Sequence, residues 1–105
     1  MTTSPPNATR VRLAGTLTVR GIEAPHAELR AALQGGAPVL IDCSAAAEVD
    51  VSLIQVLLAA RRDGGERVRL ATPLPEVLTG VLRRGGFLAA GSADLAFWQP
   101  EGTPA

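Results

Sequence analysis

The chain has 105 residues, enough for one domain with a single hydrophobic core but not for two. Ten basic residues, all arginine, balance ten acidic ones, and this zero net charge removes the electrostatic case for binding nucleic acid or an anionic membrane. One cysteine, Cys43, excludes a disulfide framework, and the N-terminus has no apolar stretch that resembles a secretory signal. The longest nearly apolar run, Val51 to Ala60, is about half a membrane span. We therefore expect a cytoplasmic domain without membrane insertion.

A single domain is expected over residues 10–98, with flexible termini at 1–9 and 99–105 that contain the Pro5-Pro6 pair and Pro100. The domain begins with apolar residues that alternate with polar or small ones on either side of Gly15-Thr16, namely Val11, Leu13, Leu17 and Val19. This period of two predicts a β-hairpin or two short antiparallel strands.

A helix is predicted next, because Ile22, Leu29 and Leu33 share one helical face and His26 lies in the same line. Pro25 suits a first-turn position, and the Gly35-Gly36 pair ends the helix.

The short apolar run Val39-Leu40-Ile41, closed by Asp42, has no alternation and is typical of a central strand buried on both faces. Such a strand implies parallel neighbours and helices above and below the sheet. The small residues Ser44 to Ala47 are expected to form a loop.

The segment from Ser52 to Arg62 is apolar almost all round, which predicts a helix buried on more than one side. Val68 and Leu70 then alternate with arginines in a strand, and an apolar stripe from Leu74 to Leu82 predicts a third helix. Leu95 to Trp98 could add a short edge strand whose exposed aromatic residues would permit a homodimer. The order β-β-α-β-α-β-α, with a further β at the end, predicts an α/β domain with a mixed sheet of four to five strands flanked by helices.

Enzyme motifs are sparse in this chain. No glycine-rich nucleotide loop follows a strand, and one cysteine with one histidine cannot build a zinc site, so neither a cofactor nor a metal is expected. Ser52, His26 and Asp50 could in principle form a nucleophilic triad, but no G-x-S-x-G elbow surrounds the serine. We expect a protein that is not an enzyme, with His26 and Cys43 in structural roles.

The segment from Asp50 to Gln55 joins the loop after the central strand to the most buried helix, at the sheet edge where ligands and partners dock in α/β proteins. Ser52 as N-cap with Gln55 three residues later would form a capping box, and Asp50 as N-cap is the rival register. A phosphate added to Ser52 would meet free backbone N–H groups and the positive end of the helix dipole, while Asp50 would oppose it. The phosphate would also bring about two negative charges into any interface there.

These segments together resemble the STAS domain, the family that includes the anti-sigma factor antagonists. The resemblance rests on Gly15 to Thr18 before a helix, on the strand Val39 to Ser44, and on Asp50 to Leu58. It extends over about Val11 to Trp98 and implies a mixed sheet flanked by helices.

The resemblance implies a non-catalytic binding module whose partner is an anti-sigma factor that is also a serine kinase. Ser52 would be the phosphoacceptor, and the unphosphorylated form would bind the partner. The partner-binding residues would be Thr18, Asp50, Val51, Ser52, Leu53 and Gln55. The alternative is a constitutive subunit of a chemotaxis, two-component or phospholipid-transport assembly, without phosphorylation.

The chain departs from the family pattern in two ways. The family usually has a small residue at position 51 and glycine at 53, where this chain has Val51 and Leu53. Leu53 would either block a kinase cleft or point into the core. At Thr18 the family frequently has an acidic residue.

Overall fold

The computed structural model describes residues 8–99 of the chain. Within that range, strands and helices follow one another in the order β1 (Thr9–Leu17), α1 (Glu23–Gln34), β2 (Val39–Val49), α2 (Val51–Gly64), a 3-10 turn (Gly65–Arg67), β3 (Val68–Leu70), α3 (Glu76–Arg84) and α4 (Leu95–Trp98). Of the predicted flexible termini, residues 1–7 and 100–105 lie outside the described residues, whereas Ala8 precedes β1, Thr9 already belongs to it, and Gln99 follows α4. The three predicted helices and the strands at Val39 and Val68 are confirmed.

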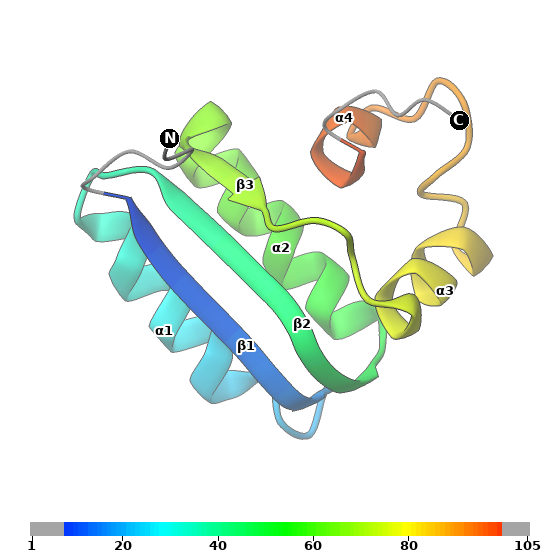
Figure 1. Cartoon of the computed structure of the whole chain (residues 1–105), viewed down its shortest axis with the longest axis horizontal. Coiled ribbons are helices and arrows are strands. Elements are labelled where there is room, and N and C mark those ends of the chain that lie inside the picture. The colour runs from blue at the N-terminus through cyan, green and yellow to red at the C-terminus, as the bar shows by residue number, and fades with distance from the viewer. Residues whose placement is uncertain (1–7, 100–105) are drawn as a thin grey trace.

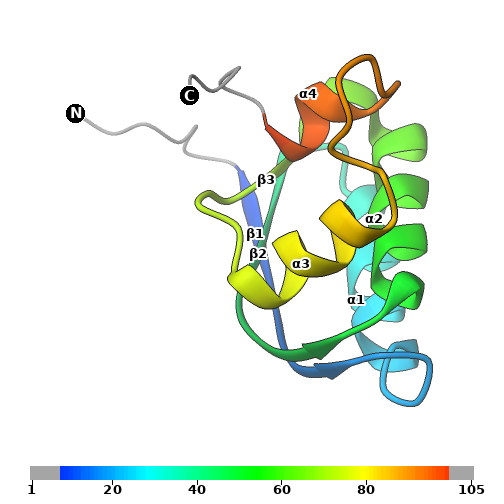
Figure 2. The same cartoon turned by 90° about the vertical axis from the view of Figure 1, so that its right-hand side faces the viewer.

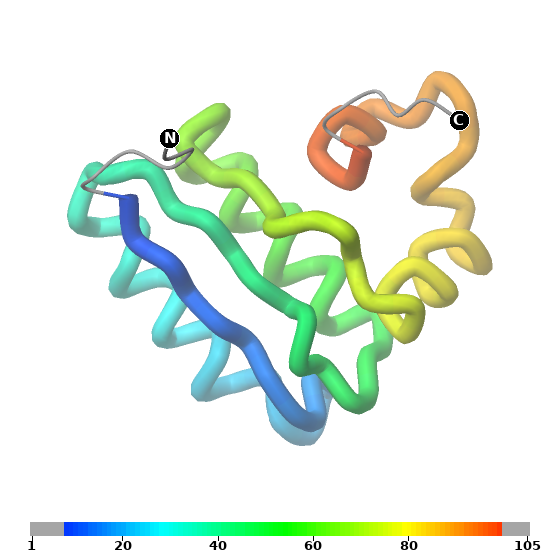
Figure 3. Tube along the Cα trace, in the orientation of Figure 1, coloured from blue at the N-terminus to red at the C-terminus, as the bar shows by residue number. Residues whose placement is uncertain are grey.

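The sheet has the order β1-β2-β3, and both pairs of neighbours are parallel (Figures 1 and 3). The α/β class is thus confirmed, and so is the central place of the Val39 strand. The predicted mixed sheet of four to five strands is wrong for residues 8–99, which form three parallel strands.

The predicted hairpin is wrong because β1 runs without a break through Gly15-Thr16 and pairs with β2 from Thr9 to Leu17. The register shifts after Arg12 and after Gly15, where β2 contributes an extra residue each time. Gly15 has a φ of 81°, a conformation that glycine adopts without steric cost. The Gly15-Thr16 pair, which predicted a tight turn, therefore lies instead at a β-bulge between two long strands. For the same reason the expected loop from Ser44 to Ala47 is part of β2.

Helices α1 and α2 cover the same face of the sheet, as the edge-on view shows (Figure 2). The strand order advances in one direction, from β1 to β2 to β3, and parallel crossovers are almost always right-handed. Two successive right-handed crossovers in one direction place both helices on one side. The prediction of helices above and below the sheet is therefore wrong, and no helix of residues 8–99 lies over the outer face of β1 and β2 (Figures 1 and 2).

The core lies between the inner face of the sheet and helices α1 and α2, while α3 and α4 close it beyond β3 (Figure 1). Cys43 is a small core residue, as expected, with 2% of its surface exposed. Burial and, to a smaller degree, the nearby charge of Asp42 together raise the pKa of its thiol to about 12. The thiol therefore stays protonated at neutral pH.

The predicted edge strand at Leu95 is wrong, because Leu95–Trp98 forms the short helix α4. Its aromatic residues are buried, with Phe97 at 3% and Trp98 at 2% exposure. The Trp98 ring meets Phe97 at a centroid distance of 5.0 Å and Phe87, edge-on, at 6.3 Å. These rings are therefore core residues, and they do not form the exposed aromatic edge from which a homodimer was inferred.

Candidate functional site

The turn after β1 and the start of α2 meet at the carboxyl edge of the sheet. Leu17 pairs with Val49 at the ends of the two strands, so the residues that follow each strand emerge side by side. The N–H of Gly21 donates to the carbonyl of Thr18 at 2.9 Å and closes a turn with Val19 near its tip. A Cβ on Gly21 would lie 2.4 Å from the carbonyl oxygen of Thr16, so this turn has no room for a side chain there.

Asp50 connects these two segments. Its Oδ1 accepts a hydrogen bond from the Ser52 N–H at 2.8 Å, and its Oδ2 accepts one from the Val19 N–H at 3.2 Å. Asp50 has extended backbone angles and is the N-cap of α2, so the capping box of Ser52 and Gln55 is wrong and the rival register is confirmed. Desolvation acts to raise the pKa of Asp50, but the hydrogen bonds from Ser52 and Val19 outweigh it and lower that pKa below its ordinary value.

Two exposed valines flank this carboxylate. Val19 is 72% exposed and Val51 is 51% exposed, and over residues 8–99 they are the exposed large hydrophobic residues. We call Val19, Asp50 and Val51 together the valine patch. Val19 is not among the predicted binding residues, because the alternation through Leu17 assigns it to the apolar side of a second strand.

The other predicted partner-binding residues lie around the valine patch, with one exception. Thr18 and Ser52 are half-buried, and Gln55 is exposed on the next turn of α2. Leu53, in contrast, is 0% exposed and belongs to the core. Of the two alternatives for this departure from the family pattern, the structure supports the core position, so Leu53 cannot contact a partner in the folded protein.

A catalytic triad at Ser52 finds no support in this geometry. The His26 ring and the Ser52 hydroxyl share no hydrogen bond in the part of the chain that the structure describes, and a general base needs such a contact. His26 instead lines a cavity of about 140 Å³ between α1 and α2, together with Val56 and Ala59. Within residues 8–99, no three His, Cys, Asp or Glu side chains are grouped so that they could hold a metal ion.

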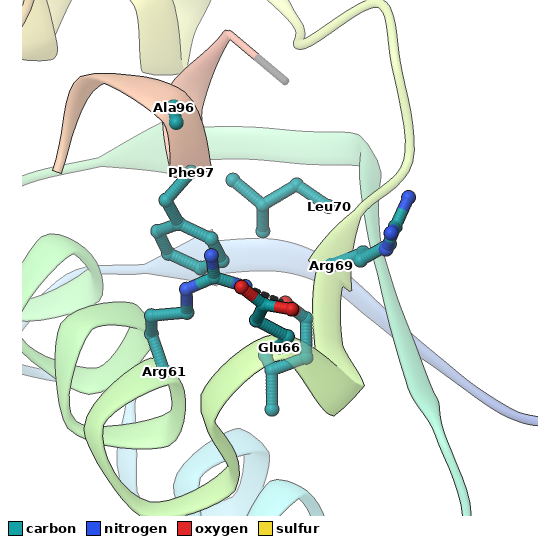
Figure 4. A pocket seen from close by; sticks show the side chains of 7 residues that line it. Arg61, Glu66, Arg69, Leu70, Ala96 and Phe97 are labelled. Atoms are coloured by element: carbon teal, nitrogen blue, oxygen red, sulfur yellow. Dashed lines mark hydrogen bonds between the residues drawn. The ribbon is translucent and has the colours of Figure 1, made fainter. Parts of the chain in front are cut away.

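A second cavity, of about 200 Å³, lies at the carboxyl end of α2, between Arg61, β3 and α4 (Figure 4). The guanidinium of Arg61 lies 5.2 Å from the centre of the Phe97 ring and donates from Nη1 to the carbonyls of Val68, at 2.7 Å, and Gly65, at 3.2 Å. These contacts join α2, β3 and α4, so we interpret Arg61 as a structural residue.

No helix within residues 8–99 combines the length and apolar character that a membrane crossing needs. Among known protein families, the one described as "Mlab, STAS domain" matches residues 1–87, which include β1 to α3 and every residue of the valine patch. No curated protein matches the chain.

Proposed function

The chain belongs to the STAS domain family, whose members are generally non-catalytic binding modules, and from this premise we propose that it is a cytoplasmic regulatory module. It docks a partner protein through the valine patch and the neighbouring Thr18, Ser52 and Gln55. The partner is an anti-sigma factor or a similar serine kinase, as in the anti-sigma factor antagonists that the sequence resembles.

The exposure of Val19 and Val51 carries this proposal. Isolated exposed valines need no explanation, but here two of them flank one carboxylate at the carboxyl edge of the sheet. The hydrogen bonds of Asp50 hold the backbone of both residues in place. Binding a partner would therefore cost little entropy for ordering this surface of the chain. Burying a valine side chain stabilises a complex by about 1.5 kcal/mol, which makes the pair a suitable centre for a small interface.

Phosphorylation of Ser52 would act on this surface through Asp50. A phosphate adds about 1.5 to 2 negative charges, and the Asp50 carboxylate already accepts the Ser52 N–H that a phosphate at this helix terminus would seek. Repulsion between the two groups would move Asp50 and release the Val19 N–H. Asp50 would then no longer hold the backbone at Val19 next to the start of α2, and the partner would be released.

The alternative is a constitutive subunit of a chemotaxis, two-component or phospholipid-transport assembly. One observation favours it: Asp50 already caps α2, so the helix terminus is satisfied without a phosphate. In this case the same surface binds its partner permanently, and Ser52 serves the fold alone.

The test compares Ser52→Ala with Ser52→Asp for binding to an anti-sigma factor that is a serine kinase. The switch predicts that Ser52→Ala binds like the wild type and that Ser52→Asp binds at least about tenfold more weakly. The control is Gln34→Glu, which adds a negative charge at the exposed end of α1 and should leave the affinity unchanged. Equal affinities for the two Ser52 variants, with no phosphorylated species by intact mass, would refute the switch in favour of the constitutive subunit.

A further inference from the structure

The outer face of the sheet carries a row of arginines. Because α1 and α2 cover the inner face, alternate residues of the strands point outward (Figure 2). In the register of the sheet, Arg10 pairs with Leu40 and Leu40 pairs with Arg69, so two arginines stand on either side of a half-buried leucine. Arg12 follows in the next row, opposite Asp42. We call Arg10, Arg12, Leu40 and Arg69 the arginine row.

This face has more positive than negative charge, although the whole chain is neutral. Asp42, 6% exposed, forms an ion pair with Arg10 at 2.6 Å. A second carboxylate of β2, the exposed Glu48, lies towards the carboxyl end of the strand, away from Arg10 and Arg69. No hydrogen bond or ion pair joins the side chain of Arg12 or Arg69 to any residue from 8 to 99. Arg69 points away from Arg61 and out of the cavity beside it (Figure 4). Among the described residues these two exposed guanidinium groups thus have no partner, and they can pair with carboxylates of another protein.

The segments outside the described residues contain little complementary charge. Residues 1–7 contain no Asp or Glu, and residues 100–105 contain one, Glu101. A nucleic acid is also a poor match, because the row has no aromatic side chain on which a base could stack and Asp42 would repel phosphates. A protein segment with carboxylates on both sides of an apolar residue matches the row in charge and in the position of Leu40.

We propose that the arginine row is a second docking surface, which binds an acidic segment of a partner protein with an apolar side chain placed on Leu40. The carboxylates of the partner's segment pair with Arg12, Arg69 and the exposed side of Arg10, whose side chain is 62% exposed. The row lies near the amino ends of the strands, whereas the valine patch lies at their carboxyl ends. The two surfaces can therefore be occupied at the same time, and this proposal does not depend on the first.

The probe is a short synthetic peptide with one leucine between flanking glutamates, titrated into the full chain and followed by NMR. We expect shifts at Arg10, Leu40 and Arg69, with none at Asp50 to Gln55, and binding that weakens as salt is added. The same peptide with lysines in place of the glutamates should not bind. A peptide with glycine in place of the leucine should bind more weakly.

The matched variants reverse charge at two faces of the molecule. Arg12→Glu/Arg69→Glu should weaken binding about tenfold or more, because two exposed ion pairs become repulsions, and Arg12→Gln/Arg69→Gln should lie between it and the wild type. Arg30→Glu/Arg62→Glu, at exposed positions of α1 and α2, makes the same charge change on the covered side and should have little effect.

Circular dichroism establishes that each variant is folded. The proposal is overturned if the glutamate peptide does not bind, if the shifts fall elsewhere, or if the double variants bind it like the wild type. Tighter binding of single-stranded DNA or of anionic vesicles than of the peptide would also overturn it, as would self-association of the chain through this face.

Discussion

The backbone N–H of Val19 donates a hydrogen bond to the carboxylate of Asp50, 31 residues further along the chain, at 3.2 Å. The same carboxylate caps helix α2 through the Ser52 N–H. One side chain thus holds the turn after β1 against the first turn of α2, and this connection gives the valine patch its shape.

Replacing Asp50 by alanine should loosen both segments. Asp50→Ala removes the N-cap acceptor and the contact with Val19, so we expect the melting temperature to fall by several degrees. Asp50→Asn keeps an acceptor oxygen and should lower the melting temperature by less. Thermal unfolding by circular dichroism checks this, and identical melting temperatures for Asp50→Ala and the wild type would contradict it.

Gly21→Ala should disturb the turn that presents Val19. The added Cβ would lie 2.4 Å from the Thr16 carbonyl oxygen, so the backbone must shift, at a cost of about 1 to 3 kcal/mol. The control is Gly35→Ala, where the Cβ would lie 3.5 Å from the Ala32 carbonyl oxygen, an ordinary contact. Urea denaturation should show destabilisation for Gly21→Ala alone. If both substitutions had the same effect, the steric argument would fail.

Leu53 and Val51, two residues apart on α2, should differ strongly in how much stability their truncation costs. Leu53→Ala removes a fully buried side chain and should lower the free energy of unfolding by about 2 to 5 kcal/mol. Val51→Ala, at a residue 51% exposed, should change it by less than about 0.5 kcal/mol. Chemical denaturation measures both values, and a small effect at Leu53 would mean that it is not a core residue.

Asp42 should make the protein less stable in acid. Hydrogen bonds from the backbone and side chain of Ser44, and then one from Arg10, lower its pKa from 3.8 to about 2. Because the pKa of Asp42 is lower in the folded protein than in the unfolded chain, the ionised carboxylate stabilises the fold. This contribution is complete above the unfolded-state pKa and is lost as the pH falls through 3.8 towards 2.

Urea denaturation between about pH 6 and pH 3 tests this, because the free energy of unfolding should fall less steeply in Asp42→Asn than in the wild type. Arg10→Gln should keep most of the pH dependence, since Ser44 is the larger cause. Equal slopes for Asp42→Asn and the wild type would show that other carboxylates govern the acid response.

The helices could be predicted from the sequence, because a period near 3.6 together with glycine pairs such as Gly35-Gly36 is a local signal. The continuous strand β1 could not, since alternation on both sides of Gly15 is the same for a hairpin and for a strand with a bulge. Only the pairing with β2 distinguishes the two. The four residues of α4 are too few to show a period, and packing of Phe97 and Trp98 into the core decides their structure.

Part of the candidate site was likewise visible in the sequence. Asp50, Val51 and Ser52 are neighbours in the chain, and Asp50 was one of the two predicted N-caps. The contact of Asp50 with Val19 and the ion pair of Arg10 with Asp42 were not visible, because they join residues 31 and 32 positions apart through the fold. The outer face of the sheet was hidden for a similar reason, since the run Val39 to Ile41 does not show that Leu40 is half-buried on a face without helices.

The most direct test of the valine patch is the affinity of the double variant Val19→Ser/Val51→Ser for an anti-sigma factor kinase that binds the wild type, measured by calorimetry. If the patch is the centre of the interface, the variant should remain folded and bind at least about tenfold more weakly, whereas Gln34→Ser on α1 should bind like the wild type. Wild-type affinity in the folded double variant would contradict the account.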